Sequence, residues 1–352
     1  MASSFLDLLA GDPVVEAFLS DEAEIAAVLA FEAGLAEVQA EIGLIPPEAA
    51  AAIRAACETF SPDLTVLAAG METDGVLGPS FVAALRGTVA EPHGRWLHKG
   101  ATSQDIVDTA LVLRLKPVLA ELDTRLAGLA EALEALKAAQ GLMPLMAQTR
   151  MQRALPFTAA DKIETWLRPL ERHRARLAEI APRLLVVQFG GPVGTRSDLD
   201  GQGDGVAEGL AERLGLGAAP PWHTARDTIV ELGGWLALVA GSLGKIGADV
   251  ALMAQNEVGA VRIEGGGGSS AMPHKSNPVD AEVLVALARF NAGLSGVLAQ
   301  SLVHENERSG AAWTLEWLTL PRMTITTAAA LRHALRLIGA LHFTPATSEQ
   351  AT

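Results

Sequence analysis

Apolar residues recur along two parts of the chain in alternating steps of four and three. One series runs from Leu115 to Leu136, and the other runs from Ile229 to Met253. This spacing puts the apolar side chains on one stripe of a helix, and long stripes of this kind are typical of helices that cross at a shallow angle in a bundle. The second helix would be roughly 36 Å long at 1.5 Å per residue, which indicates a large bundle, of a kind often shared between subunits.

The same criterion predicts further helices over residues 23–42, 156–185, 279–302 and 321–341. Pro117 and Pro169 fall inside helical patterns, so each should kink a helix or mark a boundary. Residues 189–204, rich in Gly, Asp and Ser, predict a long loop. We expect a small N-terminal helical domain over residues 1–95, a central long-helix bundle domain over 96–342 and a C-terminal tail over 343–352.

Composition supports an all-α fold. Tyrosine is absent and aromatic residues make up 4% of the chain, so strand-forming residues are scarce. The charge balance of 27 Lys and Arg against 41 Asp and Glu argues against nucleic acid or an anionic membrane as partner. A local cluster of basic side chains can still bind a small anion, because salt screens the distant surface.

Several classes of protein are disfavoured by single features. Charge or glycine interrupts the apolar stretches, which indicates a soluble protein without a membrane span. The start of the chain lacks the basic region of a signal peptide, so we expect a cytoplasmic location. The one cysteine, Cys57, excludes an internal disulfide and a thiolate metal cluster, and it is interpreted as a buried apolar residue. The eight histidines show no ligand spacing, so neither a metal nor another cofactor is expected.

Three segments carry candidate chemistry. The first runs from His98 through Thr102 and Ser103 into a predicted helix. Its simplest interpretation is a helix cap, and on its own that interpretation is favoured. A helix N-terminus with two hydroxyls and free N–H groups is also suited to binding an anion.

The second segment places Thr149, Arg150 and Gln152 in one turn before a helix. Arginine suits bidentate capture of a carboxylate, although a surface arginine in an irregular turn is the commoner explanation.

The third segment begins with four glycines at 265–268 and continues through Ser269, His274, Lys275 and Asn277 to Pro278. Four glycines often form a linker, but a linker is not normally followed by such polar residues and a long helix. The lysine spacing does not fit a phosphate-binding loop. A mobile loop that closes on substrate is the favoured interpretation, with a lysine ammonium stabilising an alkoxide or enolate.

Together these segments resemble the fumarase/aspartase superfamily of lyases. Residues 269–278 match its signature Ser-Ser-x-Met-Pro-x-Lys-x-Asn-Pro, and residues 100–109 match its element Gly-x-Thr-Ser-x-Asp-x-x-Asp-Thr. Within the superfamily the chain is most similar to the bacterial 3-carboxy-cis,cis-muconate cycloisomerases. That similarity lies in residues 187–191, 221–224, 241–246 and 307–309, with Trp313, Glu316 and Trp317.

The resemblance implies an α-helical homotetramer in which each site is built from three subunits. It implies that Ser269 is the acid–base residue and that Lys275 and Asn277 hold the substrate carboxylate and the intermediate. It assigns carboxylate binding to Thr102 and Ser103, and places His98 and Thr149 in the substrate site. Many relatives continue into a third helical domain, which is expected to be largely absent from this chain of 352 residues.

One departure from the superfamily pattern points to the reaction. Most of these lyases have a catalytic histidine directly after the threonine, whereas this chain has Arg150. An arginine with a pKa above about 12 is not a base at neutral pH, but it can neutralise a second substrate carboxylate. His274 and Arg308 are weaker candidates for substrate contact, since one is a variable signature position and the other an ordinary exposed arginine.

The expected function is therefore lactonisation of the small polycarboxylate 3-carboxy-cis,cis-muconate in aromatic catabolism through the protocatechuate branch of the β-ketoadipate pathway. A cycloisomerase for a sulfomuconate stays open, because Arg and Lys bind a sulfonate as well as a carboxylate. An adenylosuccinate-type lyase and a catalytically silent structural protein are further alternatives. Arg150 counts against the first, and the intact Ser269, Lys275 and Asn277 count against the second.

Overall fold

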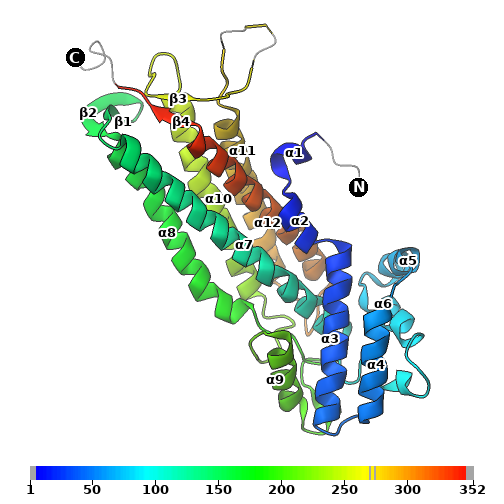
Figure 1. Cartoon of the computed structure of the whole chain (residues 1–352). Helices are drawn as coiled ribbons and strands as arrows, with labels where there is room; N and C mark the ends of the chain where they lie inside the picture. The colour runs from blue at the N-terminus through cyan, green and yellow to red at the C-terminus, as the bar shows by residue number, and fades with distance from the viewer. Residues whose placement is uncertain (1–4, 269–270, 273–274, 346–352) are drawn as a thin grey trace.

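The structure, a computed structural model, describes residues 5–268, 271–272 and 275–345. Five long helices form an elongated bundle, and shorter helices gather at one of its ends (Figure 1). The bundle helices are α7 (Ser103–Gln140), α8 (Ala159–Leu184), α10 (Asp227–Met253), α11 (Val279–Ala299) and α12 (Gly310–Gly339). The predicted all-α fold is confirmed.

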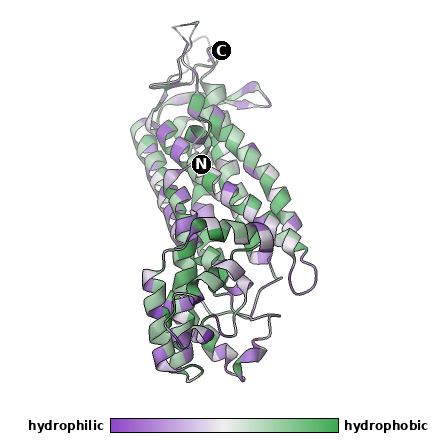
Figure 2. Ribbon diagram, turned by 90° about the vertical axis from the view of Figure 1, so that its right-hand side faces the viewer, coloured by the Kyte–Doolittle hydropathy of each residue, from purple (hydrophilic) through white to green (hydrophobic). Residues whose placement is uncertain are grey.

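The two apolar series predict the bundle core correctly. In α7 the leucines at 119, 122, 126, 129 and 133 are all buried, and in α10 the buried series runs from Ile229 to Val250. α10 packs against α8, α11 and α12, so its stripe is covered from several sides. Figure 2 shows hydrophobic and hydrophilic residues interleaved along the long helices of the bundle. Pro117 and Pro169 lie inside α7 and α8, so the alternative that they mark helix boundaries is wrong.

A second hydrophobic core lies at the end of the bundle where α7 begins. It is built mainly from α3 (Asp21–Glu41), α4 (Pro47–Thr59), α5 (Leu64–Asp74), α6 (Gly78–Arg86) and α9 (Gly203–Leu214), together with the first turns of α7. Cys57 is buried in this core, as expected. The two short helices before them, α1 (Asp7–Ala10) and α2 (Pro13–Phe18), pack instead against the bundle, α1 on α12 and α2 on α7 and α12. Short 3-10 helices occur at His93–Trp96, Ser197–Leu199 and Gln300–Leu302.

Two small antiparallel sheets lie at the opposite end (Figure 1). Strands β1 (Pro144–Thr149) and β2 (Gln152–Thr158) form a hairpin between α7 and α8. Strands β3 (Val261–Ile263) and β4 (Leu341–Phe343) pair beside it. The hairpin replaces the simple turn that we expected before α8.

Two helical segments, Asp227–Met253 and Val279–Leu302, are long and apolar enough to cross a membrane by length and composition alone. This finding differs from the expectation that charge or glycine interrupts every such stretch. It is weak evidence for a span, because core helices of soluble proteins pass the same test, and both segments pack in the bundle.

Candidate functional site

The first candidate segment forms the cap of α7. His98 and Gly100 adopt positive φ angles of 64° and 71°, and this turn brings the chain into the helix at Thr102. Thr102 is the N-cap residue, and its backbone N–H donates to Asp105 Oδ2 at 3.0 Å. Ser103 is half-buried against Gly78, where an added Cβ would come within 2.4 Å of the Ser103 hydroxyl. The capping interpretation is therefore correct, and both hydroxyls lie at the positive end of a helix of 38 residues.

His98 is held by a carboxylate from a different helix. Its Nδ1 lies 2.5 Å from Glu32 Oε1 on α3, and the Glu32 side chain is fully buried. Burial by itself lowers the pKa of His98, but the charge and hydrogen bond of Glu32 outweigh it, so the pKa is raised above its ordinary value. Glu32 therefore fixes the Nδ1 edge of the ring and favours its protonated form.

Asp105 organises the loop that faces this cap. Its carboxylate is fully buried and accepts hydrogen bonds from the backbone N–H groups of Gly190 at 2.8 Å and Gly191 at 2.9 Å. Gln188 Nε2 and His223 Nε2 lie 3.2 and 3.0 Å from Asp105 Oδ1. Two chain segments that resembled the cycloisomerases thus converge on one residue of the cap.

Arg308 reaches the same cap from the segment before α12. Its Nη2 donates to Thr102 Oγ1 and to the carbonyl oxygen of Pro192, both at 3.2 Å, and its Nε donates to Gln104 Oε1 at 2.9 Å. The structure therefore brings together Arg308, Thr102, Ser103 and His98, of which three come from one segment. A guanidinium, two hydroxyls and a helix N-terminus at one place form a suitable carboxylate-binding surface.

A buried ionic cluster lies behind this surface. The Arg226 guanidinium donates to both oxygens of Asp108 and to both oxygens of Glu316, and none of the three side chains is more than 1% exposed. Burial lowers the pKa of Arg226, but the two carboxylates raise it overall; burial raises the pKa of Glu316. Trp313 Nε1 donates to Asp108 Oδ1 at 3.0 Å.

From the sequence we predicted no functional role for Gln104, Asp108, His223 or Arg226. The available signal was the pair of acids at 105 and 108 in the motif of the first segment, because two acids on the buried face of a helix need partners. The partners, at 223 and 226, lie more than a hundred residues later, and no local pattern links them.

The second segment forms the tip of the β1–β2 hairpin. Thr149 pairs with Gln152, which leaves Arg150 and Met151 as a two-residue turn with positive φ angles of 49° and 64°. Such turns favour Asn and Gly, so two ordinary side chains here carry backbone strain. All four residues are exposed, and Arg150 points from a strained and solvent-facing tip.

Only part of the third segment can be placed. Ser269 and His274 lie outside the described residues. Gly267 and Asn277 exchange backbone hydrogen bonds of 2.9 and 2.7 Å, which close the loop at its base. Asn277 Nδ2 lies 3.4 Å from the carbonyl oxygen of Gly268, and Lys275 is exposed.

One chain does not bring the three segments together. The first segment caps the start of α7, and the hairpin follows its end, 38 residues later. At 1.5 Å per residue the two ends are about 57 Å apart. The described residues of the third segment lie at the hairpin end of the bundle (Figure 1).

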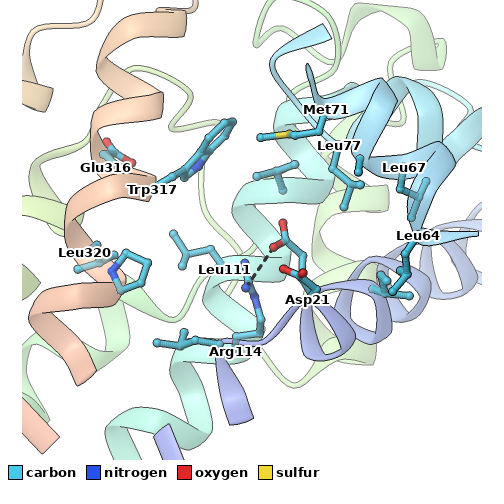
Figure 3. Close-up of a pocket in the computed structure, with 16 residues that line it drawn as sticks. Asp21, Leu64, Leu67, Met71, Leu77, Leu111, Arg114, Glu316, Trp317 and Leu320 are labelled. Atoms are coloured by element: carbon cyan, nitrogen blue, oxygen red, sulfur yellow. Dashed lines mark ion pairs between the residues drawn. The ribbon is translucent and has the colours of Figure 1, made fainter. Parts of the chain in front are cut away.

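A cavity lies elsewhere, between α3, α5, α7 and α12 (Figure 3). It has a volume of about 420 Å³ and a mostly apolar lining that includes Leu111, Met71 and Trp317. Arg114 lies in it, 3.3 Å from Glu24. No candidate residue of the three segments, as far as they are described, lines this cavity. The described residues also contain no group of three His, Cys, Asp or Glu side chains able to hold a metal ion.

Comparison with known proteins identifies the family. The model of a lyase family matches residues 12–290, which is most of the chain. The chain belongs to this lyase family. The resemblance to the fumarase/aspartase superfamily is thereby confirmed.

Members of the family that resemble the chain over most of its length include the 3-carboxy-cis,cis-muconate cycloisomerase of Pseudomonas aeruginosa. It is 44% identical over 335 residues, covering 93% of this chain and 73% of the relative. The crystal structure of the 3-carboxy-cis,cis-muconate lactonizing enzyme from Pseudomonas putida superposes with a TM-score of 0.90 at 40% identity, covering 97% of this chain and 78% of the other. Nitrosuccinate lyase of Streptomyces davaonensis is 38% identical over 351 residues, covering 94% of this chain and 73% of the relative.

Proposed function

We propose that this lyase-family chain is a cycloisomerase that lactonises 3-carboxy-cis,cis-muconate to a carboxymuconolactone. The observation that carries the proposal is the 44% identity, over 93% of the chain, to a relative named for this substrate. The carboxylate-binding surface around Thr102 and Arg308 supports it, because the substrate carries three carboxylates. The reaction belongs to the breakdown of aromatic compounds.

The reaction needs a group that delivers a proton to the substrate and groups that stabilise the negative charge of the intermediate. A carboxylate oxygen of the substrate adds to a double bond, and this forms the C–O bond of the lactone. The electron pair of that double bond moves towards a second carboxylate, giving an enediolate-like intermediate. A proton then adds to the carbon next to this carboxylate, so that the product is an isomer of the substrate.

We assign the steps as follows. Ser269 delivers the proton, and Lys275 and Asn277 stabilise the negative charge of the intermediate. Thr102, Ser103, His98 and Arg308 bind one carboxylate at the N-terminus of α7. Arg150, with Thr149 and Gln152 beside it on the hairpin, neutralises another, and His274 lies next to Lys275 in the same loop. A permanently charged arginine suits this role because the substrate supplies its own nucleophile and no protein base is needed.

We further propose that the active unit is a homotetramer with sites shared between subunits. Two observations support it: the segments of the site lie at opposite ends of one bundle, and the bundle exposes large apolar side chains. Leu238, Phe290, Val297 and Leu318 are 51%, 47%, 39% and 55% exposed. A rotationally symmetric assembly that pairs opposite ends of neighbouring bundles covers these faces and completes the sites. A single free cysteine is also compatible with a reducing compartment, and we propose the cytoplasm.

A sulfomuconate cycloisomerase is the second candidate, because the same cations bind a sulfonate. The deciding experiment mixes the purified protein with 3-carboxy-cis,cis-muconate and follows the loss of diene absorbance, with the product identified by NMR. Formation of a carboxymuconolactone is the expected result. No conversion by a folded, assembled protein would contradict the proposal, and sulfomuconate and adenylosuccinate would be tested next.

A further inference from the structure

We infer that Gln104 is a positioning residue that holds the guanidinium of Arg308 beside Thr102, so that both face one substrate carboxylate. The inference deepens the proposed function and rests on it for the identity of the substrate. Gln104 is fully buried on the first turn of α7, directly after the two hydroxyls of the cap.

The orientation of the Gln104 amide follows from its neighbours. Its Nε2 lies 2.7 Å from the carbonyl oxygen of His223 and 3.2 Å from Asp108 Oδ2. Both neighbours are acceptors, so the NH2 group must face them. The amide oxygen is thereby directed to the Nε of Arg308, 2.9 Å away.

The Gln104 contact is the best protected of the three that Arg308 makes. The bonds from Arg308 Nη2 to Thr102 and Pro192 are exposed to solvent, whereas the bond from its Nε to Gln104 is partly buried. Water competes less with a partly buried hydrogen bond to a charged group, so this contact contributes more to the orientation of the guanidinium.

The buried ionic cluster in turn holds Gln104. Asp108, which accepts from the Gln104 amide, is clamped by two hydrogen bonds from Arg226, of 2.7 and 3.1 Å. Arg226 is itself held by Glu316. A continuous series of hydrogen bonds therefore runs from the bundle core through Gln104 to Arg308 and Thr102. An arginine held in place before substrate arrives loses less side-chain freedom on binding.

A double-mutant cycle tests the inference. Gln104→Met keeps the volume of the side chain and removes the amide. We expect it to raise KM by about tenfold with a much smaller change in kcat, as for loss of a hydrogen bond to a charged group. In an Arg308→Ala background the same substitution should change KM by less than about twofold, because the group it positions is gone. Equal effects in both backgrounds would overturn the inference.

A matched control separates positioning from general damage to the core. Asn291 is another fully buried amide, and its Nδ2 donates to Leu287 O at 3.3 Å and to Thr326 Oγ1 at 2.9 Å in the bundle. Asn291→Leu should lower thermal stability and leave KM unchanged. A rise in KM equal to that of Gln104→Met would show a structural effect only. If Gln104→Met does not fold, Gln104→Asn replaces it, because a side chain one methylene shorter cannot reach both Asp108 and Arg308.

A readout that needs no turnover keeps this inference separate from the proposed function. Phenylglyoxal modifies accessible arginines, and mass spectrometry of peptides reports the rate at Arg308. We expect Arg308 to react faster in Gln104→Met than in the parent protein or in Asn291→Leu. An unchanged rate of reaction at Arg308 would overturn the inference. Failure to convert carboxymuconate would overturn the proposed function alone.

Discussion

Arg226 and Asp108 form a two-point ion pair in a place that water does not reach. The two hydrogen bonds measure 2.7 and 3.1 Å, and neither side chain is exposed. Glu316 holds the other side of the same guanidinium. One guanidinium thus pairs with two carboxylates, and Asp108 also accepts a hydrogen bond from Gln104 on the first turn of α7.

Removing the cation should therefore be far more damaging than removing one carboxylate. Arg226→Met leaves the buried carboxylates of Asp108 and Glu316 without the guanidinium that pairs with both, which should destabilise the fold by about 3–5 kcal/mol. Glu316→Gln keeps the Arg226–Asp108 pair and should cost clearly less. Urea unfolding of both variants measures the difference, and equal losses would contradict the account.

The pH dependence of substrate binding should depend on Glu32. Glu32 raises the pKa of His98, so the imidazolium is present below that raised pKa and is lost as the pH rises through it. Glu32→Gln removes the charge that raises the pKa of His98 most, while burial still lowers that pKa. The pH at which KM for the tricarboxylate begins to rise should therefore be lower in Glu32→Gln. Steady-state kinetics measured over the range from about pH 5.5 to about pH 9 would show this shift. Glu37→Gln, on the same helix but paired with Arg213, is the control, and identical KM profiles for the two variants would refute the role of Glu32.

The strained hairpin tip predicts opposite effects on stability and function. Met151→Gly relieves a positive φ angle and should raise the free energy of unfolding by about 1 kcal/mol while leaving activity largely intact. Arg150→Gly should stabilise similarly but raise KM strongly, because the anion-binding guanidinium is lost. Chemical denaturation and steady-state kinetics report the two effects. A loss of stability in Met151→Gly would show that the turn is not strained.

Ser269→Ala should abolish turnover and leave the assembly unchanged, because the variant loses only the hydroxyl that we propose as the proton donor. Activity is read from diene absorbance and the assembly from light scattering. Ser276→Ala, in the same loop, is the control. Normal turnover by Ser269→Ala would remove this serine from the chemistry.

If sites are shared between subunits, a mixture of two different inactive variants should regain part of the activity. Thr102→Ala disables one end of the bundle and Arg150→Ala disables the other. Refolding the two variants together should give mixed assemblies in which some sites draw both ends from intact copies, so that partial activity returns. The two variants refolded separately are the controls. Absence of recovery in demonstrably mixed assemblies would exclude sites shared in this way.

The bundle could be predicted from sequence because its helices are long and strictly periodic. The Ile229 series predicts α10 almost to its ends, and the Leu115 series predicts most of α7. The hairpin could not be predicted, because its turn is Arg150-Met151 and lacks the Asn or Gly that normally marks such a turn. Prolines inside α7 and α8 also show that tertiary packing overrides a local helix breaker.

The candidate site was only partly readable. Thr102, Ser103 and Arg308 could be named from motifs, and the structure places them together. The residues that hold them could not, since Gln104 has no distinctive spacing and its partners at 223 and 308 are remote in sequence. The role of a buried polar residue depends on neighbours that are remote in sequence and are known only from the fold.

The length of α7 has a consequence for how the protein behaves in mixtures. A chain that contributes its two ends to different sites carries any defect into more than one of them. The fraction of activity lost would then exceed the fraction of chains that are damaged. Dilution to a protein concentration at which the assembly dissociates would inactivate chains that are individually intact. Under the proposed sharing of sites, activity is a property of the assembly and not of one copy, because a helix about 57 Å long separates the two ends of each chain.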